Sequence, residues 1–150
     1  MTIFLSLIFF TSTSFANIQI VPFQESDLDL VFKTTALSKK PAVIYSWSPH
    51  MNLSVKGLSE LIAYCSRNGI QTIVVIDPDA NFEMAKEIVI KNKWPSEYLR
   101  PNKSLSLMKR GTRVHYPSYH FISNGKFARP PLPGYKLSQE LDEFRKGARR

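Results

Sequence analysis

Hydrophobic positions along the chain alternate between two periods, and their order predicts an α/β fold. Apolar residues recur at helical spacing over residues 25–37, from residue 54 to about residue 68, and from residue 82 toward residue 94. Two continuous apolar runs between these helices, 42–47 and 70–76, are typical of strands buried on both faces. Two such strands joined by a helix predict a parallel pair with a right-handed crossover.

The remaining segments predict strands at the margins of this core and a closing helix. Residues 18–23 alternate until Pro22 and suggest an edge strand, and the polar connection 96–113 suggests a short strand around 105–108. Residues 119–122 and 126–128 flank Ser-Asn-Gly and predict a hairpin. After a linker at 130–134, a last helix has an inner stripe of Leu137, Leu141 and Phe144. These elements predict a mixed central sheet with helices on both faces.

The first sixteen residues differ in kind and predict a signal peptide, which leaves a single domain over residues 17–150. Residues 3–10 are nearly all apolar, and Ser14 and Ala16 fit the minus-three and minus-one positions of a cleavage site before Asn17. The segment has no Lys or Arg ahead of the apolar run. An uncleaved anchor that extends through Phe15 is the alternative, although the run is shorter than the about 20 residues of a membrane span. Either reading places the protein outside the cytoplasm, in the periplasm or secreted.

The chain is basic, with 20 Lys and Arg against 12 Asp and Glu and a formal net charge of +8. From Arg100 onward there are twelve basic and three acidic residues. In a cytosolic protein such an excess would suggest nucleic acid, whereas an exported protein would meet anionic lipid, cell-wall polymer or an acidic protein. The charges are scattered, which favours a solvated surface over one binding tract. We therefore predict no nucleic-acid partner and keep an anionic envelope surface as a candidate.

Four segments carry a resemblance to a known fold family. "PAVIYSWSPHM" resembles the first core strand and Trp-led active-site loop of thioredoxin-like proteins of the bacterial envelope, and "TIVVIDPDA" resembles their next strand. "VHYPSYHFISNGKF" is similar to the segment in which a cis-proline precedes the hairpin, which would make Pro117 that proline. "LPGYKLSQELDEF" is similar to the entry into the final helix. The resemblance covers about residues 25–146 and implies a thioredoxin-like fold.

The resemblance implies a pair of cysteines at the start of the helix after the first strand, and this chain has none there. Counting from Trp47 places the pair at Met51 and Ser54; alternatively, Ser48-Pro49-His50-Met51 matches a Cys-Pro-His-Cys motif and places it at Ser48 and Met51. In both registers the residues lack a thiol. Met oxidises only to a sulfoxide, and Ser forms no disulfide. We therefore predict a degenerate active site without dithiol oxidoreductase activity, and no enzyme.

Cys65 is the only cysteine in the 150 residues. It follows Ser54 by eleven residues and lies in the apolar stripe of the same predicted helix. A single thiol cannot form an internal disulfide. Cys65 is therefore predicted to be a buried structural residue.

With redox chemistry excluded, the resemblance implies a groove that accepts an extended peptide between the active-site loop and the cis-proline. Its predicted lining is Trp47, Pro49, His50, Met51, Tyr116 and Pro117. The predicted function is a non-catalytic module that binds a protein or peptide, as a scaffold or chaperone in the envelope. Two alternatives are a component of a thiol-disulfide system that acts without its own cysteine pair, and a loop that only closes the fold.

A metal site is the second class of function considered. His50, Met51, His115 and His120 are soft or borderline ligands, and His with Met suits copper. The cysteines used by copper-handling proteins of this fold are missing, so we predict no bound cofactor. A hydrolase is the third class, since Ser48 and Ser54 lie near His50. It is disfavoured because no Gly-x-Ser-x-Gly elbow and no orienting acid accompany them.

Overall fold

The chain is described by a computed structural model that covers residues 20–110, 116–128, 132–133, 141–144 and 146. In order, its elements are α1 (Glu25–Ser38), β1 (Ala42–Trp47), α2 (Asn52–Asn68), β2 (Gln71–Ile76), α3 (Phe82–Lys91), the 3-10 helix η1 (Ser96–Leu99), α4 (Leu105–Arg110), β3 (Ser118–Ser123), β4 (Lys126–Phe127) and β5 (Leu132–Pro133). Residues 141–144 form a further helical turn. Among the described residues, no helix is both long enough and apolar enough to cross a membrane.

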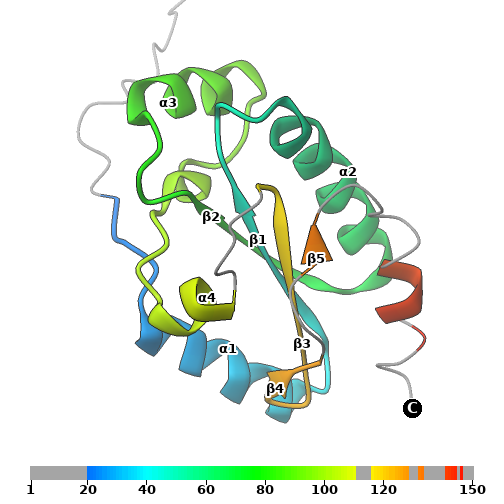
Figure 1. The fold of residues 1–150 in the computed structure, drawn as a ribbon. Coiled ribbons are helices and arrows are strands. Elements are labelled where there is room, and N and C mark those ends of the chain that lie inside the picture. Colours follow the sequence, from blue (N-terminus) through cyan, green and yellow to red (C-terminus); the bar gives the residue numbers. More distant parts are fainter. Residues whose placement is uncertain (1–19, 111–115, 129–131, 134–140, 145, 147–150) are drawn as a thin grey trace, which may run out of the picture.

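A mixed β-sheet forms the centre of the molecule (Figure 1). The strands are ordered β2-β1-β3-β4, and β5 pairs with β3 beside this path. β1 and β2 run parallel, with Ala42 beside Gln71 and Trp47 beside Ile76. β3 runs antiparallel to β1. The parallel pair and the mixed sheet predicted from the hydrophobic pattern are confirmed.

Helices cover both faces of the sheet, as predicted. α1 and α4 pack on one face, where Leu28, Val31 and Leu107 join Phe23 in one buried cluster. α2, α3 and η1 pack on the other face together with the last helical turn, and their buried residues form the larger cluster. Every residue of β1 is buried because the strand lies between these two layers.

The hairpin between β3 and β4 is built as its sequence predicts. Asn124 and Gly125 both have positive φ, 52° and 77°, and Ser123 pairs with Lys126. A two-residue turn of this kind favours Asn-Gly because both central residues lie in the left-handed region. Gly125 is also confined by α1, since an added Cβ would lie 3.0 Å from the Cβ of Ala36.

Three predicted elements differ from the structure. Residues 105–108, expected as a strand, lie in helix α4; Ser104 caps this helix by accepting a hydrogen bond from the Leu107 amide at 3.3 Å. The hydrophobic pattern did not predict a helix here because the helix buries only Leu107, whereas Leu105 is 63% exposed. The linker expected at 130–134 contains β5. In the expected edge strand at 18–23, only Phe23 makes a bridge, to Asn102, and residues 18–19 lie outside the described part.

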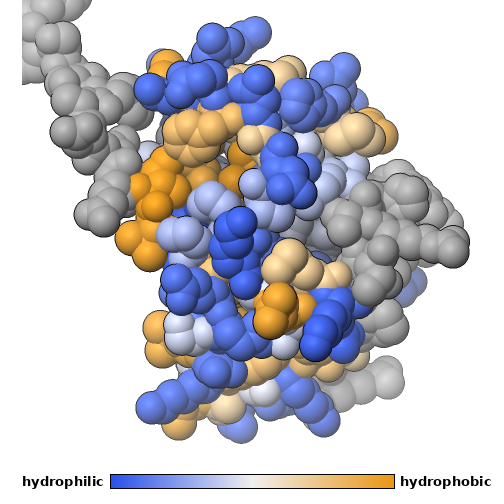
Figure 2. Space-filling view, turned by 60° about the vertical axis from the view of Figure 1, so that its left-hand side comes forward, coloured by the Kyte–Doolittle hydropathy of each residue, from blue (hydrophilic) through white to orange (hydrophobic). Residues whose placement is uncertain are grey.

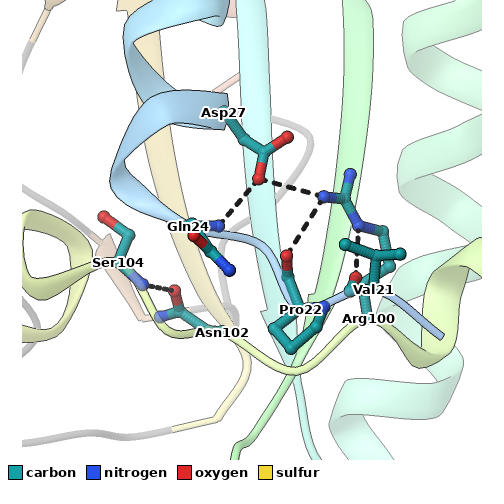
Figure 3. Close-up of polar contacts among 7 residues, drawn as sticks. All are labelled: Val21, Pro22, Gln24, Asp27, Arg100, Asn102 and Ser104. Carbon is teal, nitrogen blue, oxygen red and sulfur yellow. Dashed lines mark hydrogen bonds and ion pairs between the residues drawn. The ribbon is translucent and has the colours of Figure 1, made fainter.

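Arg100 joins the segment before α1 to the start of that helix (Figure 3). Its Nε donates to the Val21 carbonyl at 3.0 Å, and its Nη2 lies 3.1 Å from Asp27 and 3.4 Å from the Pro22 carbonyl. The guanidinium also lies over the ring of Phe23, 5.3 Å from its centroid. The planar fork of Arg suits several acceptors at once, which a Lys ammonium cannot match.

Replacing Arg100 by Met is expected to lower the free energy of unfolding by about 1–2 kcal/mol, because two carbonyls and a carboxylate lose their shared donor. Urea denaturation of both proteins would measure the change. Arg100→Lys is the matched control; it keeps the charge but loses the fork and should fall between them. Equal denaturation midpoints for all three proteins would contradict the prediction.

Candidate functional site

The candidate site lies where β1 and β2 end, since the carboxyl ends of parallel strands meet at one edge of a sheet. β1 runs into the loop 48–51 and then α2, and β2 runs into the turn 77–80 before α3. The two connections touch, because the Asp77 amide donates to the Trp47 carbonyl at 2.8 Å. The segment Tyr116–Pro117 precedes β3, whose register puts Ser118 beside Ser46 near the end of β1.

Met51 and Ser54 occupy two different environments at the start of α2. Met51 is the N-cap residue and is 45% exposed, whereas Ser54, three residues later, is fully buried. The Ser54 hydroxyl accepts a hydrogen bond from the Ser48 amide at 3.3 Å. The Tyr45 hydroxyl donates to the Ser54 carbonyl at 2.6 Å, so that α2 is fastened to β1. The pair thus has one exposed and one buried position at a helix N-terminus.

Ser48, the first residue of the alternative pair, lies in a different setting. It is 3% exposed and directly follows β1, and its carbonyl accepts from the Met51 amide at 3.1 Å to close a turn. Ser48 is therefore not at the N-terminus of α2, where backbone amides would stabilise an anion.

Trp47 is fully buried, so its expected place in the lining of a groove is wrong. Its indole Nε1 donates to the Tyr98 carbonyl at 2.9 Å, and its ring meets that of Trp94 edge-on with centroids 6.0 Å apart. The side chain points into the core because it is the last of three alternate β1 residues that face α2. Trp47 therefore packs in the core below the loop 48–51 and does not line its surface. Pro49 and Pro117 are also buried, which leaves His50 and Met51 as the exposed members of the predicted lining.

Tyr116 stands beside Pro117, and the peptide bond between them is cis. The side chain is half-buried, and its hydroxyl lies close to the Asp77 carboxylate. Burial, followed by the charges of Asp77 and Asp79, raises the pKa of Tyr116, so the phenol stays protonated. Tyr116 therefore connects the segment before β3 to the turn after β2.

The predicted metal ligands are not brought together. His50 is exposed in the loop, whereas His120 is buried in β3, beside Ile44 and on the face covered by α1 and α4. His115 lies outside the described residues. In the described part of the chain, no three His, Cys, Asp or Glu side chains form a group that could hold a metal ion.

Cys65 is fully buried in the core between α2 and the sheet. Burial raises the pKa of its thiol, and a hydrogen bond with Thr72 offsets part of this effect. A thiol in this state is a poor nucleophile. The prediction of a buried cysteine is confirmed.

Two features of the site were missed in the sequence. The first is the Asp77-Pro78-Asp79 stretch, which forms a turn with Asp77 Oδ1 accepting from the Asp79 amide at 3.0 Å. Its closeness to Tyr116 depends on the packing of distant strands. Leu53 was not assigned to the site, although it is 62% exposed in the first turn of α2.

Hydrophilic residues cover most of the face shown in Figure 2, and hydrophobic residues gather there in separate small patches. Over the described residues, the exposed large hydrophobic side chains are Val21, Leu30, Leu37, Met51, Leu53, Phe82, Met84, Ile90 and Leu105. Met51 and Leu53 are the two that lie at the start of α2.

No protein-family model matches the chain, and no curated protein is significantly similar to it. Solved structures do match. The exposed lipoprotein thioredoxin Etrx1 of Streptococcus pneumoniae aligns with a TM-score of 0.56 and 15% identity, over 77% of this chain and 89% of that one.

Two proteins of Mycobacterium tuberculosis also match. DsbF aligns with a TM-score of 0.49 and 19% identity, over 73% of this chain and 81% of that one. A secreted disulfide oxidoreductase homologous to DsbE of E. coli aligns with a TM-score of 0.47 and 19% identity, over 73% and 82% of the two chains. Together, the order of elements, the mixed sheet and the match to Etrx1 show that this chain has the thioredoxin-like fold, without a Cys-x-x-Cys pair in its 150 residues.

Proposed function

We propose that this chain is an exported, redox-inactive thioredoxin-like protein that binds an extended segment of a protein partner beside the start of α2. The observation that carries the proposal is the state of Met51 and Ser54. One is exposed at the helix N-terminus and the other is buried and hydrogen-bonded, as a nucleophilic and a resolving residue would be, but neither has a thiol. The arrangement of the loop is kept while the reaction is absent.

Binding is favoured over a purely structural loop by the exposed apolar side chains at this point. Met51 is 45% and Leu53 is 62% exposed, and their first turn of α2 contains no charged residue. A Met side chain is flexible and polarisable, which suits contacts with varied apolar groups. Tyr116 adds a half-buried aromatic ring held at its hydroxyl end by Asp77. An extended partner segment would place its apolar side chains against this surface.

Export is supported by the leader-like residues 1–16 and, at the level of similarity only, by neighbours described as an exposed lipoprotein and as secreted. Mass spectrometry of the native protein would test it. We expect a chain that begins at Asn17. An intact Met1 on a protein free in the cytoplasm would contradict export, without bearing on the binding surface.

Capture of a partner from envelope extract would test the binding surface, with wild type compared with Met51→Asp and Tyr116→Ala. Both variants are expected to retain at least tenfold less of any partner that the wild type holds, since both lose apolar contact area. Met51→Asp should remain folded, because Asp is a favourable N-cap residue and Met51 makes no side-chain cap.

Leu37→Asp is the matched control. It makes the same type of change at a side chain that is 76% exposed on α1, on the opposite face of the sheet. It should bind as the wild type does. Partner sets that are identical for all four proteins would count against the surface at α2.

A further inference from the structure

His120 is a buried ionisable residue to which the proposed function gives no role. It lies in β3 opposite Ile44 and is 2% exposed. Its ring lies 6.1 Å from that of Phe127, on the side of the sheet covered by α1 and α4. Neither ring nitrogen makes a hydrogen bond of normal geometry within the described part of the chain. Burial without a well-formed hydrogen bond favours the neutral imidazole.

Helix α4 lies against this imidazole. The Arg110 guanidinium stacks on Phe127, 4.1 Å from the ring centroid, and its charge acts on His120. Burial and then the charge of Arg110 lower the pKa of His120 to about 4, while the Leu107 carbonyl partly offsets them. From β1 and β4 the facing residues are the apolar Ile44 and Phe127. Among the described residues, Arg110 is thus the charged neighbour that a protonated His120 would meet.

The other end of α4 is held by a carboxylate from α1. Glu25 accepts hydrogen bonds from the Ser104 hydroxyl at 2.8 Å, from the Ser106 amide at 3.3 Å, and from the Ser106 hydroxyl. Chiefly the Ser106 hydroxyl bond lowers the pKa of Glu25 below its usual value of 4.5. Glu25 therefore stays ionised at both pH 7 and pH 5, so its contacts with α4 do not change between these pH values.

Few apolar contacts hold α4 against the sheet between its two polar ends. The helix has six residues, and Leu107 is its one buried side chain. Elements with few buried apolar contacts open at a lower free energy than the core. A charge that appears beneath such an element is relieved more easily by opening it than by unfolding the sheet.

We propose that α4 is a pH-sensitive element of this protein, released from the sheet when mild acidification places a proton on His120. Water can hydrate the protonated imidazole only when α4 moves away. The like charges of His120 and Arg110 then also separate. Release exposes the α1 face of the sheet around His120.

The direction of the pH effect follows from the protons that the protein binds with α4 docked and with α4 released. With α4 released, His120 regains its ordinary pKa of 6.5, whereas with α4 docked it is about 4. Between these values the released state binds more protons, so release becomes easier as the pH falls. From pH 7 to pH 5 this difference shifts the release equilibrium by about twentyfold.

Hydrogen-deuterium exchange of the full chain at pH 7 and pH 5, corrected for the intrinsic exchange rates, would test the proposal. Peptides that cover Leu105–Arg110 should lose about twentyfold in protection at pH 5. Peptides that cover β1 should keep theirs, which separates release of α4 from global unfolding. Equal protection of α4 at both pH values would overturn the proposal.

His120→Phe is the decisive variant, since it keeps a planar ring and removes the titration. Its α4 should be equally protected at pH 7 and pH 5, and an unchanged twentyfold loss would overturn the role of His120. If His120→Phe does not fold, His120→Leu takes its place. NMR titration of the wild-type imidazoles gives an independent reading: a His120 midpoint near 6.5 would also overturn the proposal.

Discussion

The double variant Met51→Cys with Ser54→Cys is expected to gain disulfide reductase activity in the presence of a thiol reductant, at least tenfold above the wild type. The wild type has no dithiol to cycle, because Cys65 is buried and unpaired. The Cα atoms of residues three apart on a helix lie about 5 Å apart, within the about 4.4–6.8 Å that a disulfide spans between Cα atoms. A thiol at position 51 would be exposed at the helix N-terminus, which lowers its pKa and favours thiolate. The second thiol, at position 54, would resolve the mixed disulfide.

The pair Ser48→Cys with Met51→Cys is the matched control. In this pair Ser48 is the first, attacking position, but it is buried at the end of β1 and away from the helix N-terminus, so its thiol would be neither accessible nor activated. This control is expected to stay inactive. Activity in the control alone would identify Ser48 and Met51 as the correct pair, and no activity in either would contradict the inferred loop geometry.

The single variant Met51→Cys extends the same test to the proposed binding surface. With Ser54 unable to resolve it, a mixed disulfide formed at position 51 would persist. A partner trapped in this way, and released by reductant, would identify what lies beside the start of α2.

Replacing Trp47 by Ala is expected to lower the free energy of unfolding by about 3–5 kcal/mol, the range for removing a buried aromatic side chain. Trp47 is fully buried, packs edge-on against Trp94, and donates its indole N–H to the Tyr98 carbonyl. Such a loss is a large part of the about 5–15 kcal/mol that stabilises a typical domain. Urea denaturation followed by circular dichroism would measure it.

Trp47→Phe separates the two contributions of this side chain. It keeps an aromatic ring but leaves the Tyr98 carbonyl without its donor, so a smaller loss of about 1–3 kcal/mol is expected. Trp94→Phe serves as a comparison for a half-buried indole in the same cluster. A loss below about 1 kcal/mol for Trp47→Ala would contradict the role assigned to this residue.

The sequence predicted the core of the fold because the side chains that a helix or strand buries are apolar and recur in a regular pattern along the chain. β1 was predicted over 42–47 and occurs there, since a strand buried on both faces is a continuous apolar run. Helix α2 was predicted to about residue 68 and ends at Asn68, before Gly69, which has a φ of 66°. Where an element buries few side chains, the hydrophobic pattern is weak, and the pattern over residues 105–108 therefore predicts a strand where the structure has helix α4.

The candidate site was predicted in part for a similar reason. Its position after β1 follows from local signals, namely a Trp, a Pro and a helix start within a few residues. These local signals do not determine which of the side chains are exposed. Trp47 is buried because Tyr98 and Trp94, about fifty residues later, pack around it. Likewise, Asp77 and Tyr116 are neighbours only because β1 pairs with both β2 and β3.

The sequence by itself determined that this protein alternates helices with buried strands, and that its 150 residues hold no Cys-x-x-Cys pair, because periodicity and residue chemistry are local properties. Only the tertiary structure decided that Met51 is exposed while Ser54 is buried, and that the imidazole of His120 lies beneath α4. These two facts depend on contacts between segments distant in the chain. Such contacts set the exposure and the proton affinity of a side chain, and no local pattern encodes them.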